Sequence, residues 1–118
     1  MKNIEKIRIG GHLFDKPSEL IKLEAQENYT LIEFKDGKKL LVATTLGKLQ
    51  KRLDTFGFFR NNRGTMVNLH YVKKVNTNGK FFNILLENNE NLHVSRRRGA
   101  NLIKISEELN ICFSGAYA

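Results

Sequence analysis

Two short segments concentrate the side chains that could recognise a nucleic acid. The first runs Phe58-Phe59-Arg60-Asn61-Asn62-Arg63-Gly64-Thr65-Met66-Val67-Asn68, and the second runs Asn91-Leu92-His93-Val94-Ser95-Arg96-Arg97-Arg98. Each arginine guanidinium is a planar fork that matches the O6 and N7 acceptors of guanine. Short amides and hydroxyls beside arginines suit phosphate oxygens, which fix a protein's register on a duplex without reading its sequence. The chemistry of both segments therefore points to a polyanion.

Positive charge is concentrated in the part of the chain that holds both segments. The whole chain has 20 Lys and Arg against 12 Asp and Glu, for a net charge of +8. Residues 55–106 contain nine basic and two acidic residues and carry +7, so the other 66 residues carry only +1. A solubilising surface mixes both signs, whereas a field of one sign attracts a polyanion. Nucleic acid is the leading partner; basic residues scattered over a solvated surface are the alternative.

The sequence carries no signature of catalysis, metal binding or membrane insertion. His12, His70 and His93 stand alone without metal-ligand spacing, and Gly10-Gly11 is expected to be a loop. The single cysteine, Cys112, cannot form an intrachain disulfide and is expected to be a small buried apolar residue. No apolar run approaches the roughly 20 residues that cross a bilayer, and the N-terminus lacks the apolar block of a signal peptide. We expect a cytoplasmic protein that is not an enzyme and uses no metal or cofactor.

The elements that position these residues are predicted to be mostly short strands. Residues 6–9 and 21–25 alternate apolar and charged side chains, and residues 29–34 are rich in aromatic and β-branched types. Asp36-Gly37 supplies the positive φ of a hairpin turn, after which residues 40–42 return. Three more strands, joined by turns rich in Asn and Gly, are expected at residues 72–75, 81–86 and 92–94.

Two segments have the spacing of amphipathic helices. Thr45–Phe56 places four apolar residues on one face and three basic residues on the other, with Thr44 or Thr45 as the cap. A second helix is expected over about residues 100–109. The class is mainly β with one or two short helices, in compact packed sheets rather than a parallel α/β sheet. Because the chain has no linker rich in Pro, Gly or Ser, we expect a single domain.

Four motifs in this order are similar to those of the LytTR family of DNA-binding domains. They are Glu27-Asn28-Tyr29-Thr30, Asp36-Gly37-Lys38, the segment from Phe58 to Asn68 followed by Tyr71-Val72, and the segment from Asn91 to Arg98. The resemblance covers about residues 21–105 and implies short antiparallel strands in stacked sheets with one or two short helices. It divides the chain into an N-terminal extension with an edge strand (1–20), a LytTR-type DNA-binding domain (21–110) and a C-terminal tail (111–118).

The resemblance also implies a function and a set of site residues. The resemblance implies a transcription regulator that inserts loop residues into successive major grooves of double-stranded DNA, commonly as two protomers on direct repeats. By position, base contacts fall on Tyr29, Asn28, Arg63 and Arg97. Phosphate contacts fall on Arg60, Asn62, Thr65, Ser95, Arg96 and Arg98.

Two positions depart from the family pattern. Asn62 stands where the family usually has histidine, and Gly64 stands where it usually has serine. Because glycine offers no hydroxyl to a phosphate, Thr65 is the candidate replacement. Only 20 residues precede the first matching strand, too few for a receiver domain. We therefore expect a stand-alone regulator, or one controlled by a separate regulatory protein.

Other interpretations remain open. The chain is alternatively a protein-interaction module that keeps the fold without reading DNA; RNA binding is less favoured because exposed aromatic pairs for stacking are lacking. Arg96–Arg98 could be a solvated run preceding a helix, and Tyr29 could pack at a sheet edge. Asn68 is expected to hydrogen-bond a turn rather than touch DNA. The residues expected in the core of the motif region are Phe58, Phe59, Val67 and Val72.

Overall fold

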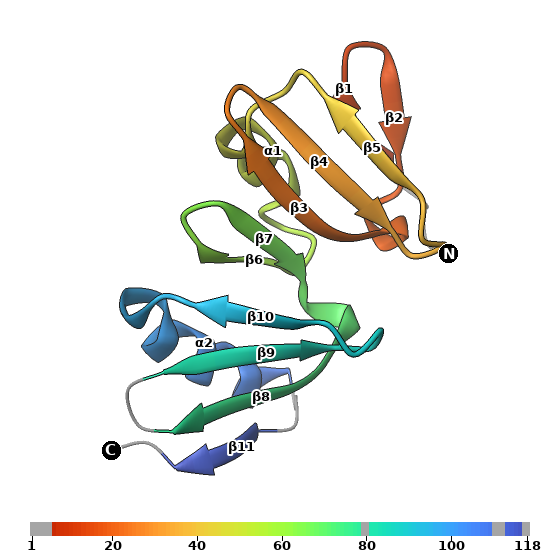
Figure 1. The fold of residues 1–118 in the computed structure, drawn as a ribbon. Helices are drawn as coiled ribbons and strands as arrows, with labels where there is room; N and C mark the ends of the chain where they lie inside the picture. Colours follow the sequence, from red (N-terminus) through yellow and green to blue (C-terminus); the bar gives the residue numbers. More distant parts are fainter. Residues whose placement is uncertain (1–5, 79–80, 110–112, 117–118) are drawn as a thin grey trace. The chain divides into compact units, whose positions relative to one another are not determined.

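The structure, a computed structural model, describes residues 6–78, 81–109 and 113–116, and in these ranges the chain is mainly β, as predicted (Figure 1). The strands are β1 (Ile7–Gly10), β2 (Leu13–Asp15), β3 (Leu20–Gln26), β4 (Tyr29–Phe34), β5 (Lys39–Val42), β6 (Phe58–Asn62), β7 (Thr65–Asn68), β8 (Val72–Asn78), β9 (Phe82–Leu86), β10 (Asn91–Val94) and β11 (Phe113–Ala116). The helices are α1 (Leu46–Leu53) and α2 (Arg96–Glu108), with 3-10 turns η1 (Pro17–Glu19) and η2 (Leu69–Tyr71). None of the helices in the described ranges is long and apolar enough to span a membrane. Cys112 lies outside the described residues, so its burial stays a prediction.

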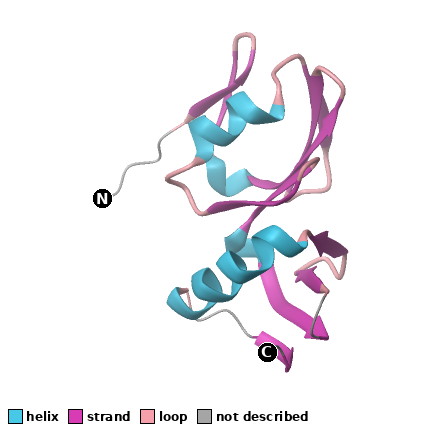
Figure 2. Cartoon of the chain, turned by 90° about the vertical axis from the view of Figure 1, so that its left-hand side faces the viewer, coloured by secondary structure: helices cyan, strands magenta, loops and turns pink. Residues whose placement is uncertain are grey.

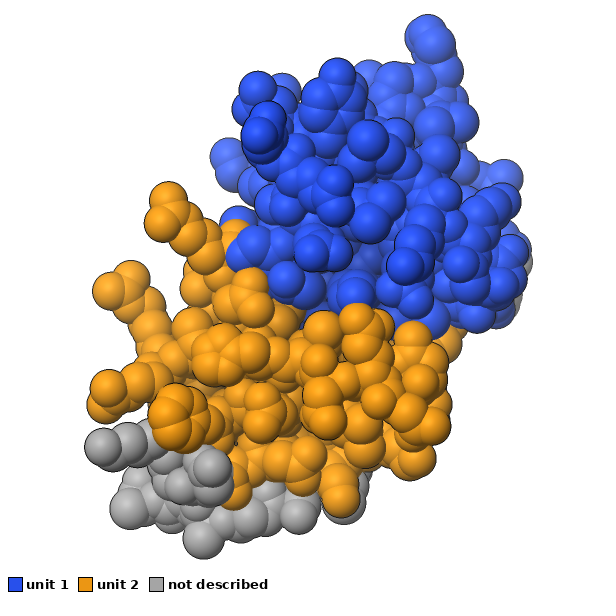
Figure 3. All heavy atoms as spheres, in the orientation of Figure 1, with its two compact units in different colours: residues 1–60, 64–69 blue, residues 61–63, 70–118 orange. Residues whose placement is uncertain are grey.

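The chain forms two compact units although its sequence has no linker (Figure 3). Unit 1 comprises residues 1–60 and 64–69, and unit 2 comprises residues 61–63 and 70–118. The chain passes from unit 1 to unit 2 within β6, returns at Gly64, and passes again after Leu69. Two of these crossings lie in or beside a β-hairpin, so the units are joined there by regular structure rather than by a linker. For this reason the amino-acid composition gave no sign of the division into two units.

Unit 1 is built on an antiparallel sheet with the strand order β5-β4-β3-β7-β6, beside the small hairpin β1-β2. The β4 strand has the predicted bounds, and Gly37 has φ of +92° in the turn that leads to β5. The backbone N–H of Lys38 donates to Asp36 Oδ1 at 2.9 Å, which closes the Asp-Gly turn. Gly10, predicted to be in a loop, is the last residue of β1. A Cβ there would lie 2.7 Å from Val42 Cβ, so β1 approaches β5 closely.

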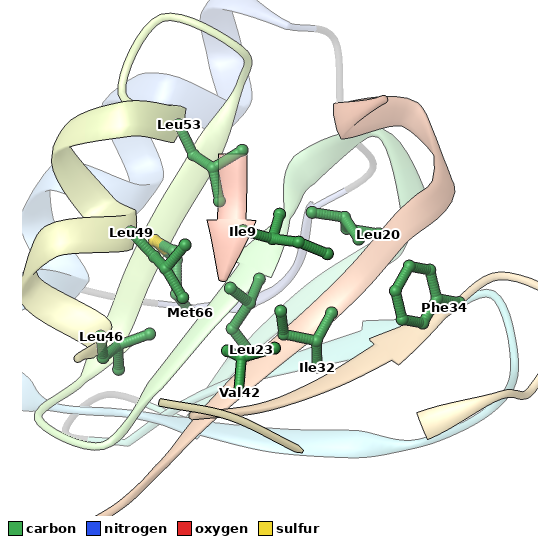
Figure 4. Packing of buried hydrophobic residues seen from close by; sticks show 10 residues of the cluster. All are labelled: Ile9, Leu20, Leu23, Ile32, Phe34, Val42, Leu46, Leu49, Leu53 and Met66. Atoms are coloured by element: carbon green, nitrogen blue, oxygen red, sulfur yellow. The ribbon is translucent and has the colours of Figure 1, made fainter. Parts of the chain in front are cut away.

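The core of unit 1 lies between α1 and the sheet (Figure 4). Leu46, Leu49 and Leu53 face inward from α1, as the predicted amphipathic pattern requires. Thr45 is the N-cap, and its Oγ1 accepts from the backbone N–H of Lys48 at 3.3 Å. The helix ends at Leu53, earlier than predicted. The other side chains that Figure 4 draws in this core are Ile9, Leu20, Leu23, Ile32, Phe34, Val42 and Met66.

The motif region supplies core residues and one buried amide to unit 1. Phe59 and Val67 are buried, and Phe58 packs partly buried against the core, as expected. Asn68 is only 1% exposed, and its Nδ2 donates to the carbonyl oxygens of Leu20 at 2.9 Å and Pro17 at 3.3 Å. Its structural role is therefore confirmed: the amide satisfies two carbonyls of the chain around η1.

Unit 2 contains a sheet of four strands in the order β10-β9-β8-β11. Strands β8, β9 and β10 form the predicted antiparallel meander, and Asn89 in the β9–β10 turn has φ of +71°, a conformation that asparagine tolerates. Strand β11 pairs in parallel with β8, within residues that the sequence assigned to a tail. Val72 is buried in this unit, as expected. Helix α2 begins at Arg96, four residues before the predicted start at residue 100.

Helix α2 lies against the meander at Gly99 (Figure 2). A Cβ at Gly99 would lie 2.5 Å from two ring carbons of Phe82, which is itself buried in β9. Gly99→Ala is therefore expected to destabilise the protein by about 1–3 kcal/mol through overpacking, which outweighs the roughly 1 kcal/mol that alanine gains over glycine in a helix. Urea denaturation of both proteins measures the difference. A stability equal to or above wild type would show that α2 can move away from β9 at no cost.

Candidate nucleic-acid interface

Arg63 occupies the turn of the β6–β7 hairpin. Strand β6 ends at Asn62 and β7 begins at Thr65, so Arg63 and Gly64 alone form the connection. The Arg63 side chain is exposed. A two-residue turn allows little backbone freedom, so the position of Arg63 is set by the two strands that the turn joins. The hairpin thus presents the guanidinium of Arg63 to solvent on a rigid support.

Hydrogen bonds within unit 2 fasten the end of β6 to the end of β10. The Asn61 side chain is fully buried, and its Nδ2 donates to the carbonyl oxygen of His93 at 2.8 Å. The backbone N–H of Ser95 donates to the carbonyl oxygen of Asn61 at 2.9 Å. Asn62 Nδ2 donates to the same His93 oxygen at 3.1 Å. We call these contacts the Asn61 clamp. Because the clamp holds residue 61 beside residue 95, Arg63 and Arg97 each lie two residues from a shared fixed point.

Three consecutive arginines open α2. Arg96 and Arg97 are exposed and Arg98 is half-buried, and Ser95 stands at the N-cap position without a side-chain cap bond. The backbone N–H groups of Arg98 and Gly99 donate to the Ser95 carbonyl. The positive end of the helix dipole disfavours cations in the first turn, and α2 has no acidic residue there. This charge arrangement does not stabilise the free helix, whereas a phosphate beside it would be attracted by both the arginines and the dipole.

Ser95 adds a polar atom at the same place. Its Oγ is buried and has no hydrogen-bond partner among the described residues. The same holds for Oδ1 of Asn61, whose Nδ2 belongs to the clamp. Buried polar groups are normally hydrogen-bonded. The start of α2 therefore has two buried polar atoms without a partner among the described residues, and the assignment of Ser95 to a phosphate contact stays a prediction.

The remaining predicted contacts belong to unit 1. Tyr29 is 48% exposed at the first residue of β4, and Asn28 is exposed in the turn before it. Thr65 is half-buried at the start of β7. Arg60 is also half-buried, and its Nη1 donates to Gln50 Oε1 on α1 at 2.7 Å. Unit 2 therefore brings together six of the ten predicted contact residues, while a common surface with these four stays a prediction.

Comparison with known proteins identifies the family. The family model described as the LytTr DNA-binding domain matches residues 13–107. The chain belongs to the LytTR family. The match begins inside the predicted N-terminal extension and ends shortly after the predicted functional segments. Membership in a DNA-binding family supports DNA binding and a role in transcription regulation, and it lends no support to catalysis.

A solved structure shares the LytTR fold. The chain is 20% identical, with a TM-score of 0.70, to the LytTr DNA-binding domain of a protein described as a methyl-accepting/DNA response regulator from Bacillus cereus. The comparison covers 89% of this chain and 97% of the other. No curated protein matches the chain. At this identity, the likeness shows a common fold and leaves the residue roles to be argued from the chain itself.

Asn61 is the residue whose importance the sequence did not reveal. It lies within the matched motif, yet the prediction gave it no role. The available signal was its position: Asn61 is two residues after the buried Phe59, so on a strand both point inward. A polar residue at an inward position needs an internal partner, but residues 58–62 were not predicted as a strand, and the partner is far away at residue 93.

Proposed function

We propose that this LytTR chain binds double-stranded DNA sequence-specifically, with Arg63 and Arg97 reading base edges in the major groove. The supporting observation is the Asn61 clamp, which fastens the turn that carries Arg63 to the start of the helix that carries Arg97. Both side chains are exposed and belong to the same unit. A guanidinium can form two hydrogen bonds with one guanine, which gives roughly 1–3 kcal/mol of discrimination. Supports fixed to each other let both contacts be made without ordering a flexible loop.

Phosphate contacts on either side of these bases complete the proposed interface. We assign Arg96, Arg98 and Ser95 to phosphates because they surround the positive end of α2. Asn62 and Thr65 flank the Arg63 turn and are assigned likewise, with Arg60 farther back on β6. Asn62 already donates to His93, so it contacts DNA with its remaining polar atoms or after exchanging that bond.

Tyr29 and Asn28 are proposed as a third base-reading element. Both are exposed in or beside a tight turn, where an aromatic ring with a hydroxyl can contact a thymine methyl group and a polar base edge. Three reading elements in successive grooves, and two protomers on direct repeats, are the arrangement that the family suggests. We include control by a separate regulatory protein in the same proposal.

Equilibrium binding to duplexes tests this function. Duplexes selected from a random pool by the protein itself supply the specific site, and a scrambled duplex of the same composition supplies the control. Fluorescence anisotropy at physiological salt is expected to show at least 10³-fold tighter binding to the selected duplex. Equal affinities would refute sequence-specific binding. Absence of salt-sensitive retention on any duplex would instead favour the protein-interaction alternative.

Arg96→Ala is expected to weaken binding to selected and scrambled duplexes by the same factor. The reason is that a phosphate contact carries no sequence information and releases condensed counterions from either duplex. The slope of log K against log salt is expected to become shallower by about 0.9, the value for one lost phosphate contact. Anisotropy titrations at several salt concentrations measure it. A loss confined to the selected duplex would mean that Arg96 reads a base.

A further inference from the structure

The outer face of α1 in unit 1 carries positive charge that the proposed interface does not use. Lys48 and Lys51 are exposed there, and Arg52 lies one turn from Lys48 on the same side of the helix. The Nη1 of Arg52 donates to the carbonyl oxygen of Arg8 at 3.0 Å, which places β1 beside this part of the helix. Lys6 and Arg8 are both exposed, on the side of β1 away from the buried Ile9. We call these five residues the α1 basic face.

Few acidic groups balance this face. Among the described residues, none of its five members forms an ion pair. Asp54 at the C-cap of α1 and Asp15, which pairs with Ile7 across the β1–β2 hairpin, are the nearest acids along these elements. The Asp15 carboxylate accepts from the backbone N–H of Lys16. A one-sign surface of this kind attracts a polyanion over a distance of about 10 Å.

Helix stability accounts for only part of this charge. Lys51 and Arg52 lie in the last turn of α1, where cations interact favourably with the helix dipole. Lys48 lies in the first turn, three residues after the N-cap Thr45, where the dipole disfavours a cation. A capping box would place Glu or Gln at this position. Lysine at 48 therefore costs the helix stability, so helix formation does not account for a cation at this position.

We propose that the α1 basic face binds the phosphate backbone of the DNA that the chain occupies. This inference rests on the proposed DNA binding and adds a sequence-independent contact to it. DNA is favoured over an acidic protein because the proposed function already brings a polyanion to the chain. Lysines are suited to phosphates as mobile point charges. Of the two arginines in the face, Arg52 already donates to the carbonyl oxygen of Arg8, so we assign phosphate contacts rather than base reading to this face.

Lys48→Glu separates the ligand role from the structural one, because the two predict opposite changes. The substitution completes the Thr45-x-x-Glu capping box and improves the helix dipole interaction, so the midpoint of urea denaturation is expected to rise. The affinity for the selected duplex, extended on both sides by random sequence, is expected to fall severalfold at low salt. The difference in affinity between the variant and wild type is expected to shrink as the salt concentration rises. Lys38→Glu, the same charge change in the β4–β5 turn of unit 1, is the matched control and is expected to bind like wild type.

The salt dependence of binding measures how many phosphate contacts the α1 basic face makes. Lys48→Gln/Lys51→Gln is expected to reduce the slope of log K against log salt by about 1.8, or about 0.9 per phosphate, while Lys38→Gln/Lys39→Gln leaves it unchanged. Equal effects of both pairs would reduce the proposal to net charge and overturn it. Unchanged binding in the α1 variants would overturn it, because the α1 basic face would then make no measurable contact with DNA.

These outcomes are separable from those of the proposed function. If wild type bound selected and scrambled duplexes equally, the claim of specificity would fail while the α1 contact remained measurable on either duplex. If wild type discriminated between them and Lys48→Glu bound as tightly as wild type, the α1 contact alone would fail.

Discussion

Alanine at Arg63 or at Arg97 is expected to cost about 1–3 kcal/mol of binding free energy on the selected duplex and much less on a scrambled one. Both residues are exposed, so the main expected effect of removing either guanidinium is the loss of its proposed hydrogen bonds to a base edge. The double variant is expected to lose about the sum of the single losses, since the two side chains contact different bases. Competition titrations with duplexes changed at single base pairs measure which position loses its preference in each variant.

Arg96→Ala is the internal control for Arg97→Ala. The two residues are adjacent in the first turn of α2 and both are exposed, but the side chains of successive helical residues point about 100° apart. Only one of them can face the same base. The Arg97 variant is expected to relax base preference, and the Arg96 variant to preserve it. If both variants lowered affinity for every duplex by one common factor, the assignment of Arg97 to base reading would be wrong.

Asn61→Leu is expected to lower stability by about 1–3 kcal/mol and to reduce DNA discrimination as well. Leucine matches asparagine roughly in volume but cannot donate to the His93 carbonyl, so the clamp loses its buried side-chain bond. The backbone bond from Ser95 N–H to the Asn61 carbonyl and the Asn62 bond remain, so the clamp is loosened rather than lost, and ordering Arg63 and Arg97 on DNA adds an entropic cost. Urea denaturation measures the first effect, and anisotropy below the unfolding range measures the second.

Asn62→Ala is the comparison for the clamp. Asn62 donates to the same carbonyl oxygen at 3.1 Å but is only half-buried, so water can replace its bond. Its loss is expected to cost less than about 1 kcal/mol of stability. Should Asn62→Ala prove as destabilising as Asn61→Leu, burial would not be what gives the clamp its strength. If Asn61→Leu kept full discrimination, the clamp would be structural only.

The regular parts of the fold were predictable because their signals are local. Strand β4 combines alternation with an Asp-Gly turn at its end, and its bounds agree with the prediction. Helix α1 is marked by Thr45 and by the inward spacing of its leucines. Strands β6 and β7 were not recognised because Arg60, Asn61 and Asn62 form a polar run in which no alternation can be seen. Their status as strands depends on pairing with distant β3, through β7.

The start of α2 was misplaced for a related reason. Gly99 is a poor helix former, and three arginines before it resemble a solvated loop. Glycine is required at position 99 because the ring of Phe82 occupies the place of a Cβ. No local sequence pattern reveals this contact, since the two residues are far apart in the sequence. The candidate site was predictable in its residue types and motif order, including Arg63 and Arg97. What the sequence did not show is the clamp that relates them, since Asn61 and His93 are 32 positions apart.

The interleaved course of the chain has a consequence for dissecting this protein. Residues 61–63 belong to unit 2, although the residues on both sides of them belong to unit 1. A fragment starting at His70 keeps the four-stranded sheet and α2 but lacks both Asn61 and Arg63. A cut before Asn61 keeps Asn61, Arg63 and Arg97 in one fragment, but this fragment also carries residues 64–69, and with them β7, out of unit 1. An exchange of contiguous segments therefore keeps the two proposed base-reading arginines together only when its junction lies before Asn61, and it then separates β7 from β3, the strand with which it pairs in unit 1.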